Sequence, residues 1–368
     1  MAKRFNNRKR FQLSLVAICF GISLLLVSDI QAGRVTYVYD SLNRLTRAVY
    51  DNTTFTYTYD RTGNRVTKKV TFTKPYWTVD FDGNGLSDLA GMNSAGNMLY
   101  TTNLQVWENV PGTLAQAVVA DFNGDGLSDL AGLTSVGNIF YTTDLQNWIN
   151  IPGVLSQLIV GDFDGDHRRS DLAGLTSGGN IYYTTDLQNW INVPGVLSQL
   201  AVGDFDGDGK DDLAGLTSNG GIWFTTNLST WTNVPGALAQ MVSGNFNPAR
   251  IGDEIAGLAS DGTIWFTTDL INWTNLPGVF SRLAVGDFNG DGRSDLAGLT
   301  LAGNIRYTTD LQNWIDIPGL LSKLVVVEDI DGDGRSDLAG ITSNGEIFYT
   351  TDLQTWVNIP GMLSELFE

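Results

Sequence analysis

The sequence predicts an all-β protein, a seven-bladed β-propeller of four-stranded blades preceded by a small N-terminal β-hairpin segment. Three observations predict this fold. Gly accounts for 42 of 368 residues and charged residues for only 17%, which is typical of many short strands joined by tight turns. A phrase related to DFDG recurs at spacings of 41 or 42 residues. Each spacing contains four short β-branched or aromatic segments bounded by turn residues, as expected for four strands.

Residues 1–32 have the layout of a secretory signal peptide. Five basic residues among the first ten precede an apolar run of 17 residues from Phe11 to Val27, and Ala32 follows shortly after. The same run could be an uncleaved anchor, because 17 residues is at the short end of what spans a bilayer. In both cases we expect a secreted, extracellular or cell-surface protein that contacts a membrane only through this segment. The one cysteine, Cys19, lies in the apolar run, so neither disulfides nor thiol chemistry is expected in the mature chain.

The chain after this leader is strongly acidic. Five of the 22 basic residues and one of the 40 acidic residues belong to the first 32 positions, which leaves 17 basic and 39 acidic residues and a net charge of −22. Because phosphate neutralisation needs a basic surface, nucleic acid is not an expected partner. Cations are expected partners.

Residues 33–75 differ from the rest and are expected to form a small β segment or linker. They contain two related phrases, YVYDSLNRL from Tyr37 and YTYDRTGNRV from Tyr57. These phrases resemble the YD, or RHS-type, repeats of bacterial cell-surface and toxin proteins, although Asn43 stands where a Gly is usual. Two repeats cannot enclose a shell, so we expect a small β-hairpin without an activity of its own. The matching residues are Tyr37, Tyr39, Asp40, Arg44, Tyr57, Tyr59, Asp60, Gly63 and Arg65.

Residues 76–368 repeat one unit seven times. Each copy has the order seen from Leu200 to Gly236: LAVGDF, an Asp/Gly loop, DLAGLTS, a Gly-rich turn, IWFTT, a short turn and WTNVPG. Four strands in about 41 residues match one propeller blade, whereas the repeats of an open parallel β-helix are much shorter. We expect residues 76–79 to supply the first strand of the first copy and the last copy to end its final strand at Pro360, so that no strand is left over. The DFDG phrase or its variant starts at Asp80, Asp121, Asp162, Asp204, Asn245, Asp287 and Asp329.

The loop after the first strand of each copy has the ligand pattern of a calcium site. In DFDGDGKDDLAG, acidic residues stand at loop positions 1, 3, 5 and 9, Gly at position 6 allows a sharp turn, and position 7 offers its carbonyl. Oxygen ligands on a flexible loop suit calcium better than magnesium and do not suit zinc. Position 12 is Gly215 instead of the Glu of an EF-hand, so the loop joins two strands. An acidic turn without metal is the alternative, but carboxylates in this register would then repel one another.

These loops resemble the FG-GAP or VCBS repeats of integrin-type propellers, over roughly residues 76–366. The resemblance implies calcium in about six loops. The third loop has one extra residue and His167 in place of the turning Gly, so a weaker site is expected there. The implied metal ligands are Asp80, Asp82, Asn84 and Asp88; Asp121, Asn123, Asp125 and Asp129; Asp162, Asp164, Asp166 and Asp171; Asp204, Asp206, Asp208 and Asp212; Asp287, Asn289, Asp291 and Asp295; and Asp329, Asp331, Asp333 and Asp337.

The fifth loop, NFNPARIGDEIAG, lacks the central ligands, and no metal is expected in it. Pro248, Ala249 and Arg250 stand where the ligands would be. We expect Arg250 to place its guanidinium near Asp253 and Glu254, in the position of the missing cation.

A second phrase, TT[DN]LxxW, ends in Trp in every copy. The ring of each Trp could form a sugar-stacking pocket or could pack between blades. Packing is favoured, because a repeated core requires the same residue at the same point of every blade. The phrase loosely resembles the Asp-box hairpins of other propellers. The residues are Trp107, Trp148, Trp190, Trp231, Trp273, Trp314 and Trp356.

The sequence favours recognition over catalysis. The single His, His167, lies in the irregular third loop, and the carboxylates are grouped as metal ligands rather than as an acid/base pair, so no catalytic residue is nominated. We expect a monomeric, calcium-binding propeller that recognises or adheres to a protein or glycan at the cell surface. The alternatives are a carbohydrate-active enzyme of the lyase or hydrolase type on a calcium-containing propeller, or a purely structural part of an RHS or toxin-like surface assembly.

Overall fold

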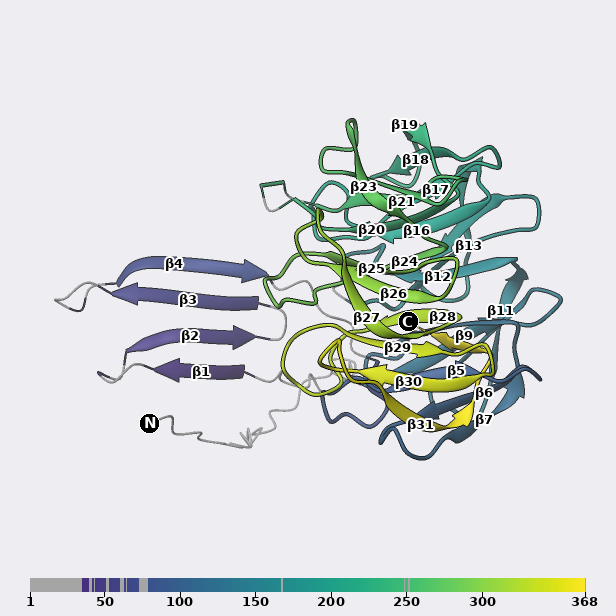
Figure 1. Ribbon diagram of the computed structural model, residues 1–368, viewed down its shortest axis with the longest axis horizontal. Helices are drawn as coiled ribbons and strands as arrows, with labels where there is room; N and C mark the ends of the chain where they lie inside the picture. The colour runs from purple at the N-terminus through teal and green to yellow at the C-terminus, as the bar shows by residue number, and fades with distance from the viewer. Residues whose placement is uncertain are drawn as a thin grey trace, which may run out of the picture. The chain divides into compact units, whose positions relative to one another are not determined.

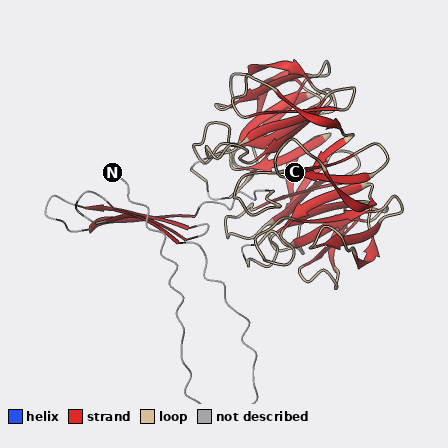
Figure 2. Ribbon diagram, turned by 90° about the horizontal axis from the view of Figure 1, so that it is seen from below, coloured by secondary structure: helices blue, strands red, loops and turns tan. Residues whose placement is uncertain are grey.

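The computed structural model describes residues 35–72, apart from 40–41, 43, 51–52, 60–62 and 64, and residues 79–367, apart from 167, 248 and 251. Its regular elements in these ranges are all β-strands, and the chain divides into two compact units, Met1–Thr73 and Lys74–Glu368 (Figures 1 and 2). The leader predicted at residues 1–32 lies outside the described residues. Within the described ranges, no helix has the length and apolar character needed to cross a membrane.

The N-terminal unit is a four-stranded antiparallel sheet in the order β1-β2-β3-β4. Each YD phrase runs from one strand of a hairpin into the next, and the two hairpins are joined, so the unit has two hairpins where a single small hairpin was expected. The hydroxyl of Tyr59 in the second phrase donates to the Leu45 carbonyl at 2.8 Å, and Arg44 Cζ lies 4.7 Å from the centre of the Tyr59 ring. The two phrases are therefore tied together. The strands are Val35–Tyr39, Leu45–Tyr50, Thr53–Tyr59 and Arg65–Phe72.

The second unit contains seven four-stranded antiparallel sheets, the blades of a β-propeller, as predicted. The first strands of successive blades contact one another in a closed circle, β8-β12-β16-β20-β24-β28-β32 and back to β8. Blades two to seven are continuous in sequence. Their strands are β8–β11 (Gln116–Ala120, Asp129–Leu133, Asn138–Thr142, Ile149–Val154), β12–β15 (Gln157–Gly161, Asp171–Leu175, Asn180–Thr184, Ile191–Val196), β16–β19 (Gln199–Gly203, Asp212–Leu216, Gly221–Thr225, Thr232–Ala237), β20–β23 (Gln240–Gly244, Glu254–Leu258, Thr263–Thr267, Trp273–Val279), β24–β27 (Arg282–Gly286, Asp295–Leu299, Asn304–Thr308, Ile315–Leu320) and β28–β31 (Lys323–Val327, Asp337–Ile341, Glu346–Thr350, Val357–Met362).

Blade one joins the two ends of the ring. Its strands β5 (Leu89–Met92), β6 (Asn97–Thr101) and β7 (Glu108–Thr113) are completed by the C-terminal strand β32 (Glu365–Phe367), which pairs antiparallel with β5. The expectation that residues 76–79 supply this strand was wrong, because β32 occupies its place; Val79 lies outside any strand, and residues 76–78 lie outside the described part of the chain. The sequence contains the reason: GMLSELF from Gly361 repeats GVLSQLA from Gly195, which leads into a first strand.

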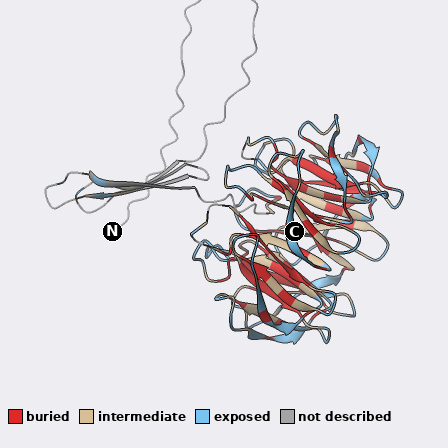
Figure 3. Cartoon of the chain, turned by 90° about the horizontal axis from the view of Figure 1, so that it is seen from above, coloured by how far each residue is buried: buried red, intermediate tan, exposed pale blue. Residues whose placement is uncertain are grey.

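The core consists of seven clusters, each formed where two blades face one another (Figure 3). Between blades two and three, Ile139 and Ile151 pack against Leu158 and Leu172. The second strand of blades two to seven is buried along its whole length. Both of its faces meet other blades, which explains why DLAGL is a continuous apolar run instead of an alternating one.

The repeated Trp residues pack between blades, as the sequence favoured. Trp190 Nε1 donates to the Pro152 carbonyl of the preceding blade at 2.6 Å, and Trp356 does the same to Pro318 at 2.6 Å. Trp314 differs, because its ring packs on Phe280 with a centroid distance of 4.4 Å. Its Nε1 has no hydrogen-bond partner among the described residues.

Candidate metal sites

The predicted metal loops lie on one face of the ring. In blades two to seven each loop joins the first strand to the second strand, and loop one leads into β5 and is bonded to loops two and seven on the same side. In an antiparallel meander the second-to-third turns and the connections between blades lie on the opposite face. We call the side with the Asp/Gly loops the loop face and the opposite side the turn face. Loop one belongs to blade one and begins at Asp80, and the other loops follow in chain order.

The side chain at loop position 1 folds each regular loop around itself. In loop one, Asp80 Oδ1 accepts the N–H of Gly83 at 2.7 Å and Oδ2 accepts that of Gly85 at 2.8 Å. Gly83 and Gly85 have φ of 75° and 82°, which is the left-handed region that favours Gly. The same pair of contacts recurs in loops two, four, six and seven. The sequence pattern of alternating Asp and Gly therefore produces one repeated loop conformation.

The predicted ligands come together in these loops. In loop one, one carboxylate oxygen from each of Asp80, Asp82 and Asp88 lies within 4.8 Å of the others. Loops two and six have Asn at position 3, which adds an amide oxygen to their three carboxylates. The corresponding trios in the third, fourth and seventh loops, within the same limit, are Asp162, Asp164 and Asp171; Asp204, Asp206 and Asp212; and Asp329, Asp331 and Asp333.

Loop three keeps its ligand group despite the extra residue. Asp171 Oδ2 accepts the N–H of Phe163 at 2.7 Å, just as Asp88 accepts that of Phe81 at 2.6 Å. Asp166 lies beside this trio and accepts the N–H of Arg168 at 2.8 Å. His167 lies outside the described residues.

The position-9 carboxyl groups are buried, and their surroundings disfavour the charged form. They are between 1% and 4% exposed, and burial raises their pKa, with a further rise from the neighbouring acidic groups of the same loop. The pKa of Asp212 rises to about 8, and that of the other five to about 7. A cation in the loop would relieve this repulsion, so the residues present fit a hard divalent ion with oxygen ligands. The five are Asp88, Asp129, Asp171, Asp295 and Asp337.

Loop five has an arginine in place of the metal ligands. Arg250 Nη1 donates to the Asp253 carbonyl at 2.6 Å and lies 3.4 Å from Glu254 Oε1, while Nη2 donates to the Phe205 carbonyl of loop four at 2.6 Å. Glu254 is fully buried and replaces the position-9 Asp. The guanidinium therefore pairs with Glu254 as predicted, but it meets Asp253 through the carbonyl, because the Asp253 carboxylate accepts the N–H of Asp204 at 3.0 Å. Pro248 lies outside the described residues.

Neighbouring loops are joined by reciprocal hydrogen bonds that the sequence analysis missed. Ser128, at position 8 of loop two, donates its N–H to the Asp80 carbonyl at 2.7 Å and accepts the Asp80 N–H on Oγ at 2.8 Å. The signal was the Ser or Asp that precedes the position-9 acid in each copy. The other pairs are Asp162 with Asp211, Asp204 with Asp253, Asn245 with Ser294, Asp287 with Ser336, and Asp329 with Ser87.

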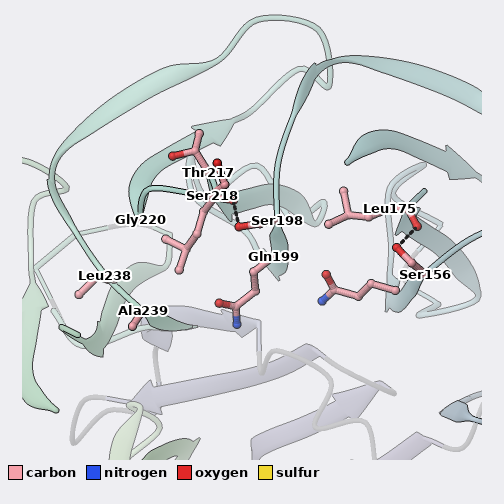
Figure 4. Close-up of a pocket in the computed structure, with 11 residues that line it drawn as sticks. Ser156, Leu175, Ser198, Gln199, Thr217, Ser218, Gly220, Leu238 and Ala239 are labelled. Carbon is pink, nitrogen blue, oxygen red and sulfur yellow. Dashed lines mark hydrogen bonds between the residues drawn. The ribbon is translucent and has the colours of Figure 1, made fainter. Parts of the chain in front are cut away.

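The turn face carries a hollow of about 520 Å³ over blades three and four (Figure 4). Its polar lining is uncharged: the Ser156 and Ser198 hydroxyls donate to strand-end carbonyls at 3.1 and 3.0 Å, and Gln157 bonds the backbone of Leu200 in the next blade. Among the described residues, Gln199 makes no equivalent bond to blade five. This hollow offers hydroxyl and amide groups, in contrast to the carboxylates of the loop face.

Comparisons with known proteins support a propeller. Residues 79–249 match the Tectonin domain family. The chain is similar to two crystal structures of BBS1N in complex with ARL6DN. The structure soaked with mercury has 13% sequence identity and a TM-score of 0.53, and the match covers 69% of this chain and 83% of that chain. The structure soaked with lead has 14% identity and a TM-score of 0.54, and the match covers 71% of this chain and 86% of that chain. No curated protein matches the chain. At these identities the structures show the shared fold alone.

Proposed function

We propose that this chain is a secreted or cell-surface β-propeller that binds calcium in six loops and recognises a protein or glycan partner. The observation that carries the proposal is the contrast between loop five and the other six. Four of those six bring three carboxylates within 4.8 Å of one another, and loops two and six have the same register with one Asn in it, whereas the loop without that register places the Arg250 guanidinium against Glu254. In loop five, where the metal ligands are missing, the Arg250 guanidinium supplies a positive charge. This supports a bound metal ion supplying the positive charge in the loops that keep their ligands.

The position 1, 3, 5 and 9 side chains and the position 7 carbonyl of each loop would hold the ion. Bound calcium would neutralise the clustered carboxylates, as in the FG-GAP and VCBS loops that the sequence resembles. Because positions 1 and 8 also join adjacent blades, an ordered loop would stabilise the contact between blades. The metal therefore has a structural role in this proposal, and affinities of about 10⁻⁴ to 10⁻³ M, common in extracellular modules, would suffice.

The recognition role rests on the rigid ring and its two chemically different faces. The similar BBS1N structure holds ARL6DN, a protein partner of that propeller. We propose a protein or glycan partner here, with the uncharged hollow on the turn face of blades three and four as one surface that could receive it. An enzyme is less favoured, because the clustered carboxylates are assigned to the metal loops. The YD resemblance supports placement at a bacterial cell surface.

Calcium-dependent melting of the full chain tests the metal proposal. The melting temperature is expected to rise in calcium relative to chelator, because calcium binds only the folded ring, and to rise less in magnesium. The variant Asp206→Asn/Asp208→Asn, which removes two ligand charges from loop four, should lose part of the rise. Identical melting in calcium and chelator would defeat the proposal.

A glycan array read in calcium and in chelator tests the recognition proposal. Retention of the chain by glycans would identify a glycan partner, whereas cleavage of the arrayed glycans would favour the enzyme alternative. Without either result, a protein partner or a structural role would be favoured.

A further inference from the structure

In loops one, two, three, four and seven, the residue at position 7 reaches the preceding loop. The space that a Cβ on Gly83 of loop one would take is filled by Leu127 Cδ2 of loop two, at 3.0 Å, and the equivalent space on Gly332 of loop seven by Leu86 Cδ2 of loop one, at 3.1 Å. In other loops a basic side chain fills this space: Arg168 lies on Gly124 of loop two, Lys210 on Gly165 of loop three and Arg335 on Gly290 of loop six.

Basic groups therefore contact five of the six proposed metal loops. Lys210 Nζ donates to the carbonyl of Asp164, a ligand residue of loop three, at 2.9 Å. Arg250 contacts the Phe205 carbonyl of loop four, and Arg335 Nε also lies 3.8 Å from Asp333 Oδ2 of loop seven. Within the described part of the propeller, loop one has only leucines, Leu86 and Leu127, at these positions, and no hydrogen bond or ion pair joins it to a Lys or Arg.

We propose that these neighbouring side chains make the calcium affinities of the loops unequal, with weaker binding where a basic side chain contacts the loop. Loop one is then the tightest site in this grading and fills first. The inference rests on the proposed function. A fixed positive charge roughly 6 Å from a bound divalent ion, in largely aqueous surroundings, weakens binding about tenfold. Salt reduces this difference, because these side chains are partly exposed.

Loops one and two form a matched pair for this comparison. Each has three carboxylates and one amide as predicted side-chain ligands, Asp80, Asp82, Asn84 and Asp88 against Asp121, Asn123, Asp125 and Asp129. The two loops therefore have equal numbers of carboxylate and amide ligands. The difference in charge near them comes from the side chain that contacts each loop, Leu127 on Gly83 of loop one and Arg168 on Gly124 of loop two.

Loop one also lies where the two ends of the ring meet. Ser87 bonds Asp329 of loop seven, and Asp88 leads directly into β5, the strand that receives the C-terminal strand β32. The first calcium bound would therefore order the closing junction of the ring. Closure is expected at a lower calcium concentration than full loading.

Calorimetric titration of the full chain with calcium at low salt tests the grading. The wild type should show one tight ion per chain ahead of a weaker class. Leu127→Arg should weaken the tight ion about tenfold, whereas Leu127→Met, which adds no charge, should not. Arg168→Leu should move a second ion into the tight class.

The outcomes separate the two proposals. If the wild type binds several ions and Leu127→Arg leaves the tight ion unchanged, the grading is overturned while the metal proposal stands. If the wild type binds no calcium, the proposed function itself fails. If Leu127→Arg does not fold in chelator, Arg168→Leu decides: two tight ions support the grading, and one overturns it.

Discussion

Ser87 and Asp329 are joined by two reciprocal hydrogen bonds although 242 positions separate them. The Ser87 N–H donates to the Asp329 carbonyl at 2.7 Å, and the Asp329 N–H donates to Ser87 Oγ at 2.9 Å. The same pair occurs between Ser336 and Asp287, but there the chain runs continuously from one blade to the next. One hydrogen-bond geometry thus serves both a covalently linked junction and the junction that closes the ring.

Ser87→Ala should loosen the closing junction more than Ser336→Ala loosens its own. Each change removes the acceptor of one N–H and should lower the free energy of unfolding by about 1–3 kcal/mol. Only Ser87→Ala should speed hydrogen exchange in β32, because Ser87 precedes β5, the strand that pairs with β32, whereas Ser336 lies in blade seven. Equal exchange of β32 amides in the two variants would show that the Ser87 contact does not secure the closure.

Arg250→Ala should destabilise the ring whether or not calcium is present. The change leaves Glu254 fully buried without its cationic partner, which typically costs about 3–5 kcal/mol, and loop five has no ligand set with which calcium could replace it. The double variant Arg250→Ala/Glu254→Gln should recover part of the loss. Chemical unfolding measures both. Restoration of Arg250→Ala by calcium alone would mean that loop five can bind the ion.

Trp190→Phe and Trp314→Phe should differ although the two Trp residues are equivalent in sequence. Trp190 Nε1 donates to the Pro152 carbonyl, so its loss should cost about 1 kcal/mol beyond the change in packing. Trp314 Nε1 has no partner among the described residues, and its ring already packs on Phe280. Unfolding free energies would contradict this account if Trp314→Phe were the more costly change.

In chelator, the stability of the ring should fall as the pH rises from about 4 to about 7. The ordinary pKa of an Asp carboxyl is 3.8, and burial raises that of Asp88 and Asp337 to about 7 in the folded chain. The folded state then binds more protons than the unfolded state across this interval, so raising the pH favours unfolding. Calcium should flatten the dependence by stabilising the charged carboxylates.

Unfolding free energies measured across this range, with and without calcium, test the pH dependence. The variant Asp337→Asn should show a shallower fall in chelator, since it removes one of the six position-9 carboxyl groups whose pKa is raised by burial. A stability in chelator that instead rises between pH 4 and 7 would refute this account of the buried groups.

The repeat made most of the fold predictable. The spacing of the DFDG phrases located seven blades, and the apolar DLAGL run marked the strand that is buried on both faces. The loop register likewise identified the residues that come together, such as Asp204, Asp206 and Asp212. The loop register depends on contacts within one repeat, which a single copy of the sequence already contains, and the number of blades follows from the number of copies.

The features that escaped prediction depend on contacts between repeats. The closing strand β32 could have been found, because GMLSELF is the seventh copy of the first-strand phrase. The hydrogen bonds between Ser87 and Asp329 and the contact of Leu127 with Gly83 could not have been found. The sequence of one copy does not determine which neighbouring loop its residues at positions 7 and 8 will contact. Those contacts are set by how the blades stack around the ring.

The anomalous scattering of calcium in a crystal of the full chain tests the central claim most directly. The account predicts an ion in each of loops one, two, three, four, six and seven, bound by the side chains at positions 1, 3 and 5 and the buried carboxylate that closes the loop. It also predicts none in loop five, where Arg250 lies beside Glu254. Loops without an ion at saturating calcium, or an ion bound in loop five, would contradict it.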